Sequence, residues 1–454
     1  MVSRVAAILR PLAGVVLFAA LALPVDAQET QRYPDIVLVT IDTLRTDRLS
    51  SYGYHRPTSP HLDRLIGDGI QFTEARVTEP LTAPSMVSMV TSRHPHAHGT
   101  SRNGLRMRPD LESLPKILAR RRYRSAAFVS NWTLRDEISG LAEHFDEYHE
   151  VFTRKRWYVF AAEADGDDVT EAALDWASDY IKDRREDRRE PMLLWAHYVE
   201  PHEPYRFHEE FADELGITER DNVPISDRYD TEVAFVDRAV GQLLEGIDEL
   251  VGLDDVLILF ASDHGESLGE HGYWGHGRNL YEPTLHIPMS ITWKRRLEPR
   301  TIEAPASLLD LTPTVFGLLD LPVHPSFEGY DWSPVLLEGA EPPHDRVTYH
   351  QAHKGAVQRA GNTEARRQGL LEVARVENGR KETLRTRSDH RRLFDLGRDR
   401  KELNSLVADD TAPSEDLVRW LEAVREGLAA ADELPAAELD DEAIEKLRAL
   451  GYID

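Results

Sequence analysis

The chain contains no cysteine among its 454 residues. This absence excludes disulfide bonds, thiolate zinc sites, cysteine nucleophiles and a lipid anchor on an N-terminal cysteine. Basic side chains are scarce relative to acidic ones, because 54 Lys and Arg face 80 Asp and Glu, which gives a net charge of −26. Such an acidic excess argues against a nucleic-acid partner and against binding to anionic membranes. If the substrate is an anion, the positive charge that attracts it must be local.

The first 27 residues have the pattern of a cleavable secretory signal. Arg4 and Arg10 precede an apolar run at 12–23, and residues with short side chains follow up to Ala27, the order found in such signals. We expect cleavage after Ala27 and a periplasmic or secreted protein. The alternative is an uncleaved anchor, but the run is shorter than the roughly 20 apolar residues of a spanning helix. We therefore expect no stable membrane span after cleavage.

Short apolar runs alternate with helical patterns through most of the remaining chain. Short runs rich in β-branched side chains are typical of buried strands in a largely parallel sheet. Helical periodicity appears at 113–123 and 231–250, with a loop-like segment at 223–230. The alternation predicts an α/β fold with a doubly wound, mostly parallel sheet and helices on both faces. The expected strands are 35–41, 125–130, 192–199, 256–262 and 287–293.

The length of the chain and a change of texture near residue 325 predict two parts. We expect a catalytic domain at 28–325 and a smaller C-terminal α+β subdomain at 326–454. In the second part, Asn378-Gly379 separates two strand-like segments and predicts a β-hairpin. The segment 415–430 has helical periodicity, and the acidic end of the chain, 438–454, is interpreted as a solvated helix.

Several potential metal ligands follow the expected strands. Asp42 follows the first run, Asp263 and His264 follow the fourth, and His271 and His276 come soon after. Ligands of doubly wound sheets bind beyond the carboxyl ends of the strands, and gathered carboxylate and imidazole groups suit a divalent cation. Taken alone, Asp42 fits a turn or a helix cap equally well.

The chain resembles the sulfatase family within the alkaline phosphatase superfamily in four segments: "DIVLVTIDTLRTDRLSSYGY", "TAPSMVSMVTSRHPHAHG", "EPHEPY" and "SDHGESLGEHGYWGHGRNLYE". They occur in the family's order, and "SLLDLTPTVFGLLDLP" and "LFDLGRDRKELNSL" are similar to its later segments. No single motif is decisive, but the ordered set is specific. The resemblance implies an alkaline phosphatase-like fold, ester hydrolysis, and a C-terminal antiparallel sheet and helix packed on the main domain.

The chain departs from the family's usual pattern within these segments. Thr43 stands where many sulfatases have a second aspartate after the first strand. Thr82-Ala-Pro-Ser-Met replaces the family's Cys/Ser-x-Pro-Ser-Arg, so both the formylglycine precursor and the arginine are absent. His276 and Asn131 match positions where the family has lysines.

The resemblance implies that Thr82 is the nucleophile. Thr82 precedes a helical pattern, so we expect its hydroxyl at a helix N-terminus, where free N–H groups favour an anion. A threonine hydroxyl needs activation at neutral pH, which contact with a metal provides. The alternative is that Thr82 only caps the helix. Other polar residues of this segment are interpreted as structural (Ser85 and Ser88) or as structural or substrate-edge residues of a loop (His94, His96 and His98).

One divalent cation is expected in the site. Its expected ligands are Asp42, Thr82, Asp263 and His264. The missing carboxylate at Thr43 and the added imidazole favour Mn²⁺ or Zn²⁺, with Ca²⁺ and Mg²⁺ as the alternatives.

Four further side chains are expected to act on the substrate. The resemblance implies a catalytic role for His276 and substrate contacts for His202, Asn103 and Asn131. A second ion at Glu200, His202 and His276 is the weaker hypothesis, because no pair of aspartates accompanies them.

These observations predict a periplasmic or secreted, metal-dependent hydrolase of sulfate, phosphate or phosphonate esters on a small molecule or a glycan. A formylglycine hydrate can expel sulfate by reforming its carbonyl, whereas a Thr82 adduct must be displaced at its central atom, which favours phosphorus esters. The alternatives are a transferase that moves a phosphoryl-containing group through Thr82 onto an envelope glycan or lipid, and an inactive binding protein. Retention of Asp42, Asp263 and His264 argues against inactivity.

Overall fold

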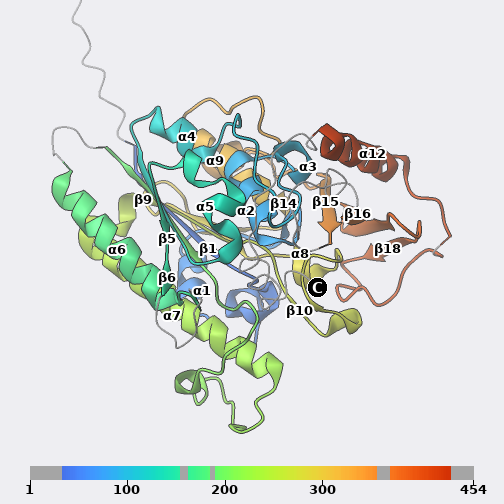
Figure 1. The fold of residues 1–454 in the computed structure, drawn as a ribbon, viewed down its shortest axis with the longest axis horizontal. Coiled ribbons are helices and arrows are strands. Elements are labelled where there is room, and N and C mark those ends of the chain that lie inside the picture. Colours follow the sequence, from blue (N-terminus) through green and yellow to red (C-terminus); the bar gives the residue numbers. More distant parts are fainter. Residues whose placement is uncertain (1–32, 154–161, 185–189, 355–368, 409, 431–454) are drawn as a thin grey trace, which may run out of the picture. The chain divides into compact units, whose positions relative to one another are not determined.

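An eight-stranded sheet lies at the centre of the described part of the chain (Figure 1). The computed structural model describes residues 33–153, 162–184, 190–354, 369–408 and 410–430. The strands lie in the order β13-β2-β12-β9-β1-β8-β4-β5. Their bounds are β1 Asp35–Ile41, β2 Ile70–Phe72, β4 Arg124–Val129, β5 Glu147–Glu150, β8 Met192–Tyr198, β9 Val256–Ser262, β12 Met289–Thr292 and β13 Arg300–Ile302.

The predicted, mostly parallel sheet is confirmed. Strands β9, β1, β8, β4 and β5 run parallel to one another. They include four of the expected strands, and the fifth, 287–293, forms β12, which runs antiparallel to both β9 and β2. The carboxyl ends of the parallel strands therefore meet at one edge of the sheet.

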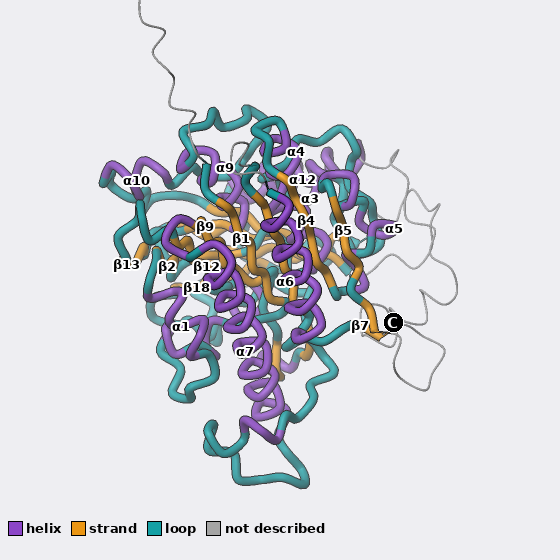
Figure 2. The backbone as a smooth tube through the Cα atoms, turned by 90° about the vertical axis from the view of Figure 1, so that its left-hand side faces the viewer, coloured by secondary structure: helices purple, strands orange, loops and turns teal. Residues whose placement is uncertain are grey.

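Helices cover both faces of the sheet (Figures 1 and 2). On one face, alternate β1 side chains, Val37, Val39 and Ile41, pack against helices in a common core. The helices of that face are α1 Pro60–Gly67, α6 Gly166–Asp183 and α7 Ile225–Val251, and those of the other are α2 Thr82–Thr91, α4 Leu114–Ala119 and α9 Leu311–Leu318.

The loop expected at 223–230 is wrong, because α7 already begins at Ile225. Pro224 occupies the N-cap position of α7, and Tyr229 and Asp230 are buried in its second turn. Asp230 is satisfied by Arg48, whose Nη1 lies 2.8 Å from its Oδ1. A tertiary ion pair therefore stabilises a helical turn that is too polar to be recognised locally.

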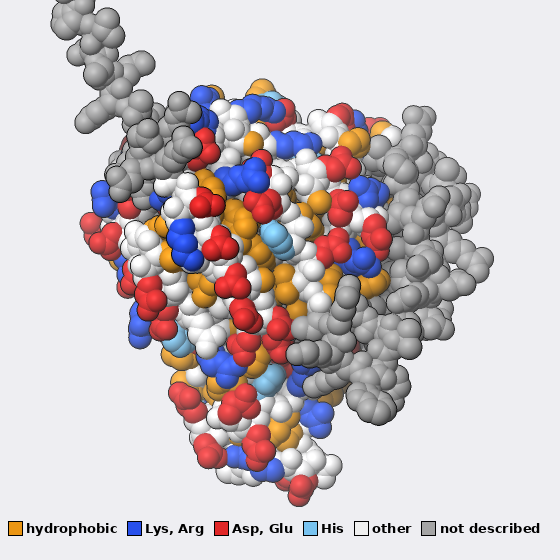
Figure 3. Space-filling view, turned by 60° about the vertical axis from the view of Figure 1, so that its left-hand side comes forward, with side chains coloured by type: hydrophobic (Ala, Val, Ile, Leu, Met, Phe, Trp, Pro, Cys, Tyr) orange, Lys and Arg blue, Asp and Glu red, His pale blue; other side chains and the backbone are white. Residues whose placement is uncertain are grey.

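The outer face of α6 is acidic. Exposed acids recur every four residues along it, at Asp167, Glu171, Asp175, Asp179 and Asp183. Figure 3 shows acidic side chains, in red, spread over the side of the molecule where α6 lies in Figure 1. Such a stripe repels polyanions. Among the described residues, no helix combines the length and the apolar character that crossing a membrane requires.

A second, four-stranded antiparallel sheet follows in the chain. Its strands are β15 Thr348–His353, β16 Leu370–Glu377, β17 Arg380–Arg385 and β18 Arg391–Asp395. The expected hairpin joins β16 to β17, and both turn residues, Asn378 and Gly379, have positive φ (50° and 70°), as a type I′ turn requires. The helix α12 Glu415–Ala430 packs Leu417 and Val424 on this sheet.

Shorter elements complete the described fold. The helices are α3 Pro95–His98, α5 Asp136–Ser139, α8 Glu282–Leu285 and α10 Ser333–Glu338. The strands are β3 Ala75–Arg76, β6 Phe152–Thr153, β7 Ala162–Glu163, β10 Ser267–Leu268, β11 Trp274–Gly275 and β14 Ala306–Ser307. The domain boundary at residue 325 stays a prediction, and the expected signal and the acidic segment at 438–454 lie outside the described residues.

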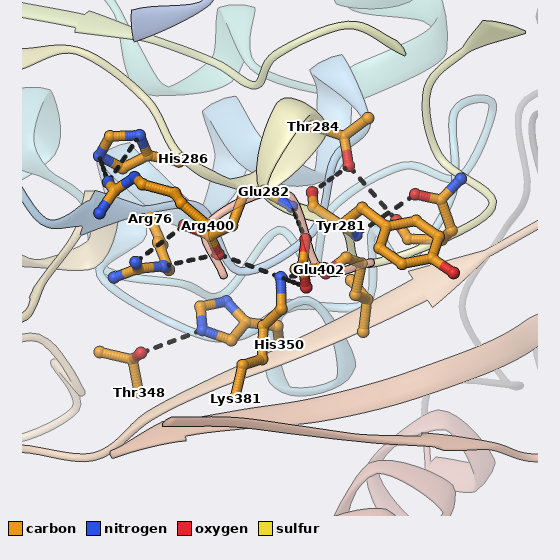
Figure 4. A network of polar contacts seen from close by, with 12 residues as sticks. Arg76, Tyr281, Glu282, Thr284, His286, Thr348, His350, Lys381, Arg400 and Glu402 are labelled. Atoms are coloured by element: carbon orange, nitrogen blue, oxygen red, sulfur yellow. Dashed lines mark hydrogen bonds and ion pairs between the residues drawn. The ribbon is translucent and has the colours of Figure 1, made fainter. Parts of the chain in front are cut away.

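A buried ionic network joins the second sheet to α8 and to the short strand β3 (Figure 4). Glu282, which begins α8, receives Arg76 Nη2 at 2.9 Å and Lys381 Nζ at 3.0 Å. Lys381, on β17, also lies 2.5 Å from Glu402, and its side chain is 0% exposed. Because each ion is fully removed from water, its partners must all be present to offset the lost hydration.

We predict that Lys381→Met destabilises the protein by about 3–5 kcal/mol, since it leaves buried carboxylates without their cation. The measurement is urea-induced unfolding followed by circular dichroism. The matched control is Lys294→Met, because Lys294 pairs with Asp68 at 2.8 Å but both side chains are about two-fifths exposed; its effect should stay below about 1 kcal/mol. Equal effects of the two substitutions would contradict the prediction.

Candidate active site

Asp42 and Asp263 stand side by side at the carboxyl edge of the large sheet. Strands β1 and β9 pair in parallel with Ile41 opposite Ser262, so the next residue of each strand reaches the same point. Both carboxylates are fully buried. Burial raises the pKa of Asp263 to about 7, because a buried carboxylate loses the hydration that favours its charged form. The donor set and its burial therefore fit a divalent cation.

Backbone amides hold the Asp263 side chain. Its Oδ1 accepts hydrogen bonds from Thr43 N at 3.0 Å and His264 N at 2.7 Å. Thr43 has a φ of 55°, a left-handed conformation that β-branched residues adopt only under constraint. Asp263 Oδ2 accepts no hydrogen bond within the described part of the chain and lies 3.3 Å from His264 Nε2. This oxygen faces the space between the ligand candidates.

Thr82 is the first residue of α2 and is fully buried. Leu81 holds the N-cap position, and no side chain makes a capping hydrogen bond there, so Thr82 does not have the alternative role of a cap. The Thr82 Oγ1 atom lies 3.4 Å from His264 Nε2. His264 Nε2 in turn lies 3.8 Å from Asp42 Oδ1. The structure thus brings the four expected metal ligands together.

Two asparagines brace this group. Asn103 Oδ1 accepts a hydrogen bond from Ala83 N at 3.1 Å, at the start of α2, while its Nδ2 is buried and has no partner among the described residues. Asn131 donates from Nδ2 to Asp42 Oδ2, and its Oδ1 accepts from Thr133 N at 2.8 Å. Asn131 therefore orients Asp42, and its expected substrate contact stays a prediction.

A histidine pair lines the same site. The rings of His202 and His276 lie 5.2 Å apart, and those of His264 and His276 lie 4.3 Å apart. Burial lowers the pKa of His202 to about 4. Burial acts to lower the pKa of His276, but nearby carboxylates outweigh it and raise that pKa; the main one is Glu266, 3.0 Å from His276 Nδ1, and Asp263 and Glu203 add to it. His276 is therefore the better proton donor of the pair.

The sequence analysis missed two residues of the site. Glu266 pairs with His276 and follows Asp263 by three residues, so its position just after the end of β9 was a usable signal. His197 lies inside β8, and Asp42, His197 and Asp263 can bring donor atoms to within 4.8 Å of one another. Burial lowers the pKa of His197 to about 3, so its ring is neutral. A lone polar residue in an otherwise apolar strand was its only signal.

The polar residues near Thr82 have structural contacts. Ser85 Oγ donates to Asp263 O at 2.5 Å, and Ser88 Oγ lies 3.0 Å from His98 Nε2. The loop expected around the histidines is wrong, because Pro95–His98 forms α3 and His98 is fully buried. His94 and His96 pack on Trp420 of α12, with ring centres 4.7 and 4.9 Å from the Trp420 ring.

The hypothesis of a second ion at Glu200, His202 and His276 stays a prediction. Asp42, His197 and Asp263 form the one group of potential ligands of this kind among the described residues. Burial and the neighbouring Glu232 raise the pKa of Glu200 to about 8.

Comparisons with known proteins agree with this geometry. A family model described as Sulfatase matches residues 34–321. The N-acetylglucosamine-6-O-sulfatase of Bacteroides thetaiotaomicron is 22% identical over 76% of this chain and 78% of its own. The choline-sulfatase of Rhizobium meliloti is 24% identical over 84% of this chain and 83% of its own.

A solved structure shares the fold. The phosphonate monoester hydrolase of Agrobacterium radiobacter superimposes with a TM-score of 0.65 at 19% identity, over 90% of this chain and 100% of its own. This likeness bears on the fold alone, and it agrees with the expected alkaline phosphatase-like architecture.

Proposed function

The chain belongs to the sulfatase family of the alkaline phosphatase superfamily, a family of ester hydrolases, and from this premise we propose a metal-dependent hydrolase in which Thr82 is the nucleophile. The observation that carries the proposal is the position of the Thr82 hydroxyl. It lies at the first residue of α2, makes no capping bond, and sits 3.4 Å from His264 beside two buried carboxylates.

We propose that Asp42, Thr82, Asp263 and His264 hold one divalent cation, with Mn²⁺ or Zn²⁺ favoured over Ca²⁺ and Mg²⁺. Such a cation lowers the pKa of a hydroxyl that it contacts and neutralises charge on the substrate oxygens. The buried, acidic donor set supports a cation here, and the imidazole of His264 supports a metal that accepts nitrogen.

The reaction then runs in two displacements. Thr82 Oγ1, whose proton has passed to solvent, forms a bond to the sulfur or phosphorus atom as the bond to the leaving oxygen breaks. His276 donates its proton to that oxygen, which leaves as an alcohol. Water next attacks the Thr82 adduct, gives a proton to His276, and releases the inorganic product and the Thr82 oxygen. The Glu266 carboxylate keeps His276 protonated for the first step.

His202 and Asn103 are proposed to contact the ester. Asn103 uses its Oδ1 on the helix, which leaves its Nδ2 donors for a substrate oxygen. His202 lies against His276 and reaches the same side of the site. The names of relatives suggest a glycan ester or a small-molecule ester as the substrate, N-acetylglucosamine and choline esters being examples among them.

Phosphorus esters are proposed to be better substrates than sulfate esters. Thr82 cannot release its adduct by reforming a carbonyl, so the second step is displacement at the central atom, a reaction well known for phosphoryl groups.

We predict that phosphodiester or phosphonate monoester turnover exceeds aryl sulfate turnover in a panel tested with several metals. Thr82→Ala should lower kcat by at least about a thousandfold, as expected for loss of a nucleophile. Ser88→Ala is the matched control, since Ser88 is a buried hydroxyl on the same helix that bonds to His98. Efficient sulfate cleavage by Thr82→Ala would refute both the nucleophile and the preference.

The proposed acid gives a pH dependence with a defined sign. His276 donates only when protonated, so kcat should fall as the pH rises through its pKa. Glu266→Gln removes the carboxylate that raises this pKa and should move the alkaline limb of the kcat profile to lower pH. Glu270→Gln is the control, because Glu270 pairs with Arg45 instead. An alkaline limb that Glu266→Gln leaves in place would exclude His276 as the acid.

We propose export to the periplasm or the exterior, directed by residues 1–27. The charge and apolar pattern of that segment supports it. N-terminal sequencing of the protein expressed in a bacterium with its own leader should find a periplasmic product that begins near Gln28. A cytoplasmic product with an intact N-terminus would count against the proposal.

A further inference from the structure

His197 occupies a position next to the paired carboxylates. Strand β8 pairs with β1 so that His197 lies opposite Thr40, and the following residue, Tyr198, accepts a hydrogen bond from Asp42 N at 2.9 Å. His197 is 0% exposed. The parallel register therefore delivers an imidazole to the point where Asp42 leaves the sheet.

The distances suit one shared ion. Donor atoms of Asp42, His197 and Asp263 lie within 4.8 Å of one another. Ligand atoms that each lie about 2 Å from one cation are roughly 3–4 Å apart, so small side-chain rotations suffice for all three to coordinate.

The two ring nitrogens of His197 differ in their surroundings. Nδ1 lies 2.8 Å from Thr40 Oγ1, whereas Nε2 is buried and has no hydrogen-bond partner among the described residues. Thr40 Oγ1 also accepts from Trp195 Nε1 at 2.8 Å, and a hydroxyl oxygen can accept two such bonds. If Nδ1–H donates to Thr40, the Nε2 lone pair is left for a cation, which is the usual arrangement of a ligating histidine.

Charge balance supports a neutral ligand at this place. Asp42 and Asp263 already match the charge of a divalent ion, and the residue after Asp42 is the uncharged Thr43. An imidazole completes the coordination without adding a negative charge to the dry site.

We propose that His197 binds the divalent cation directly through Nε2, and that Thr40 is a positioning residue that fixes the ring. The inference rests on the metal centre put forward in the proposed function. With His264 it gives the cation two nitrogen ligands, a set that suits Mn²⁺ or Zn²⁺ better than Ca²⁺.

A packing role is the competing explanation, and His144 provides its matched control. His144 is likewise buried, with Nδ1 at 2.8 Å from Ser113 Oγ and Nε2 without a hydrogen-bond partner in the described residues. It belongs to no group of potential metal ligands within those residues. Any effect of His197→Ala that His144→Ala shares is therefore structural.

The test compares metal binding in the full-length protein after chelation and dialysis. Mn²⁺ and Zn²⁺ affinities are measured by calorimetry, and melting temperatures are measured with and without metal. His197→Ala should weaken binding by about a hundredfold or more and Thr40→Val by about tenfold, since outer partners of a ligand alone contribute 10- to 100-fold. The metal-dependent rise in melting temperature should shrink accordingly. His144→Ala should instead keep both the wild-type metal affinity and the wild-type metal-dependent rise in melting temperature.

Pulsed EPR of the wild-type protein with Mn²⁺ counts the imidazole nitrogens bound to the metal, and this count does not depend on whether a variant folds. Two imidazole nitrogen couplings are expected, of which His197→Ala removes one. A single coupling in the wild type, or wild-type affinity in His197→Ala, would overturn the role of His197. Asp263→Asn distinguishes failure of the proposed metal centre from failure of the role of His197. If Asp263→Asn keeps full metal affinity, the metal centre itself is wrong. If Asp263→Asn loses the metal while His197→Ala keeps full affinity, only the role of His197 is overturned.

Discussion

Two carboxylates that meet in a dry site impose the constraint on which the rest of this active centre depends. The parallel register of β1 and β9 places Asp42 and Asp263 together, fully buried. Carboxylates so placed require donors and positive charge around them. The amides of Thr43 and His264 and the side chain of Asn131 supply the donors. A divalent cation is the simplest source of the charge.

The second sheet supports the segment that leads into Thr82. Gln351 N on β15 donates to Thr78 O at 2.9 Å, and His353 Nδ1 lies 2.8 Å from Glu79 Oε1. These contacts hold the segment that leads into α2 and therefore into Thr82. The buried network around Glu282 and Lys381 ties the same sheet to the loop region after β9. The accessory part thus acts on the geometry of the centre, although it supplies none of the proposed ligands.

The differences between prediction and structure share one cause, which is burial of polar residues through distant partners. The segment before residue 231 has a loop-like composition, but Asp230 pairs with Arg48 in the interior and the helix begins earlier. The histidines after α2 also have the composition of an exposed loop. They are partly or wholly buried because distant residues contact them. His94 and His96 pack on Trp420, more than three hundred residues away in the chain, and His98 lies beside Ser88.

The sequence by itself determined the α/β class, five of the eight strands of the large sheet, the hairpin at Asn378-Gly379 and the helix at 415–430, because hydrophobic periodicity and turn chemistry are local properties. Through ordered motifs it also determined the family and the residues Asp42, Thr82, Asp263 and His264 as candidates. Only the tertiary structure decided that Glu266 faces His276, that Asn131 turns to Asp42, and that His197 lies beside the carboxylates. These relations depend on strand order and register, which bring residues from separate segments into contact and leave no mark in the local pattern of any one of them.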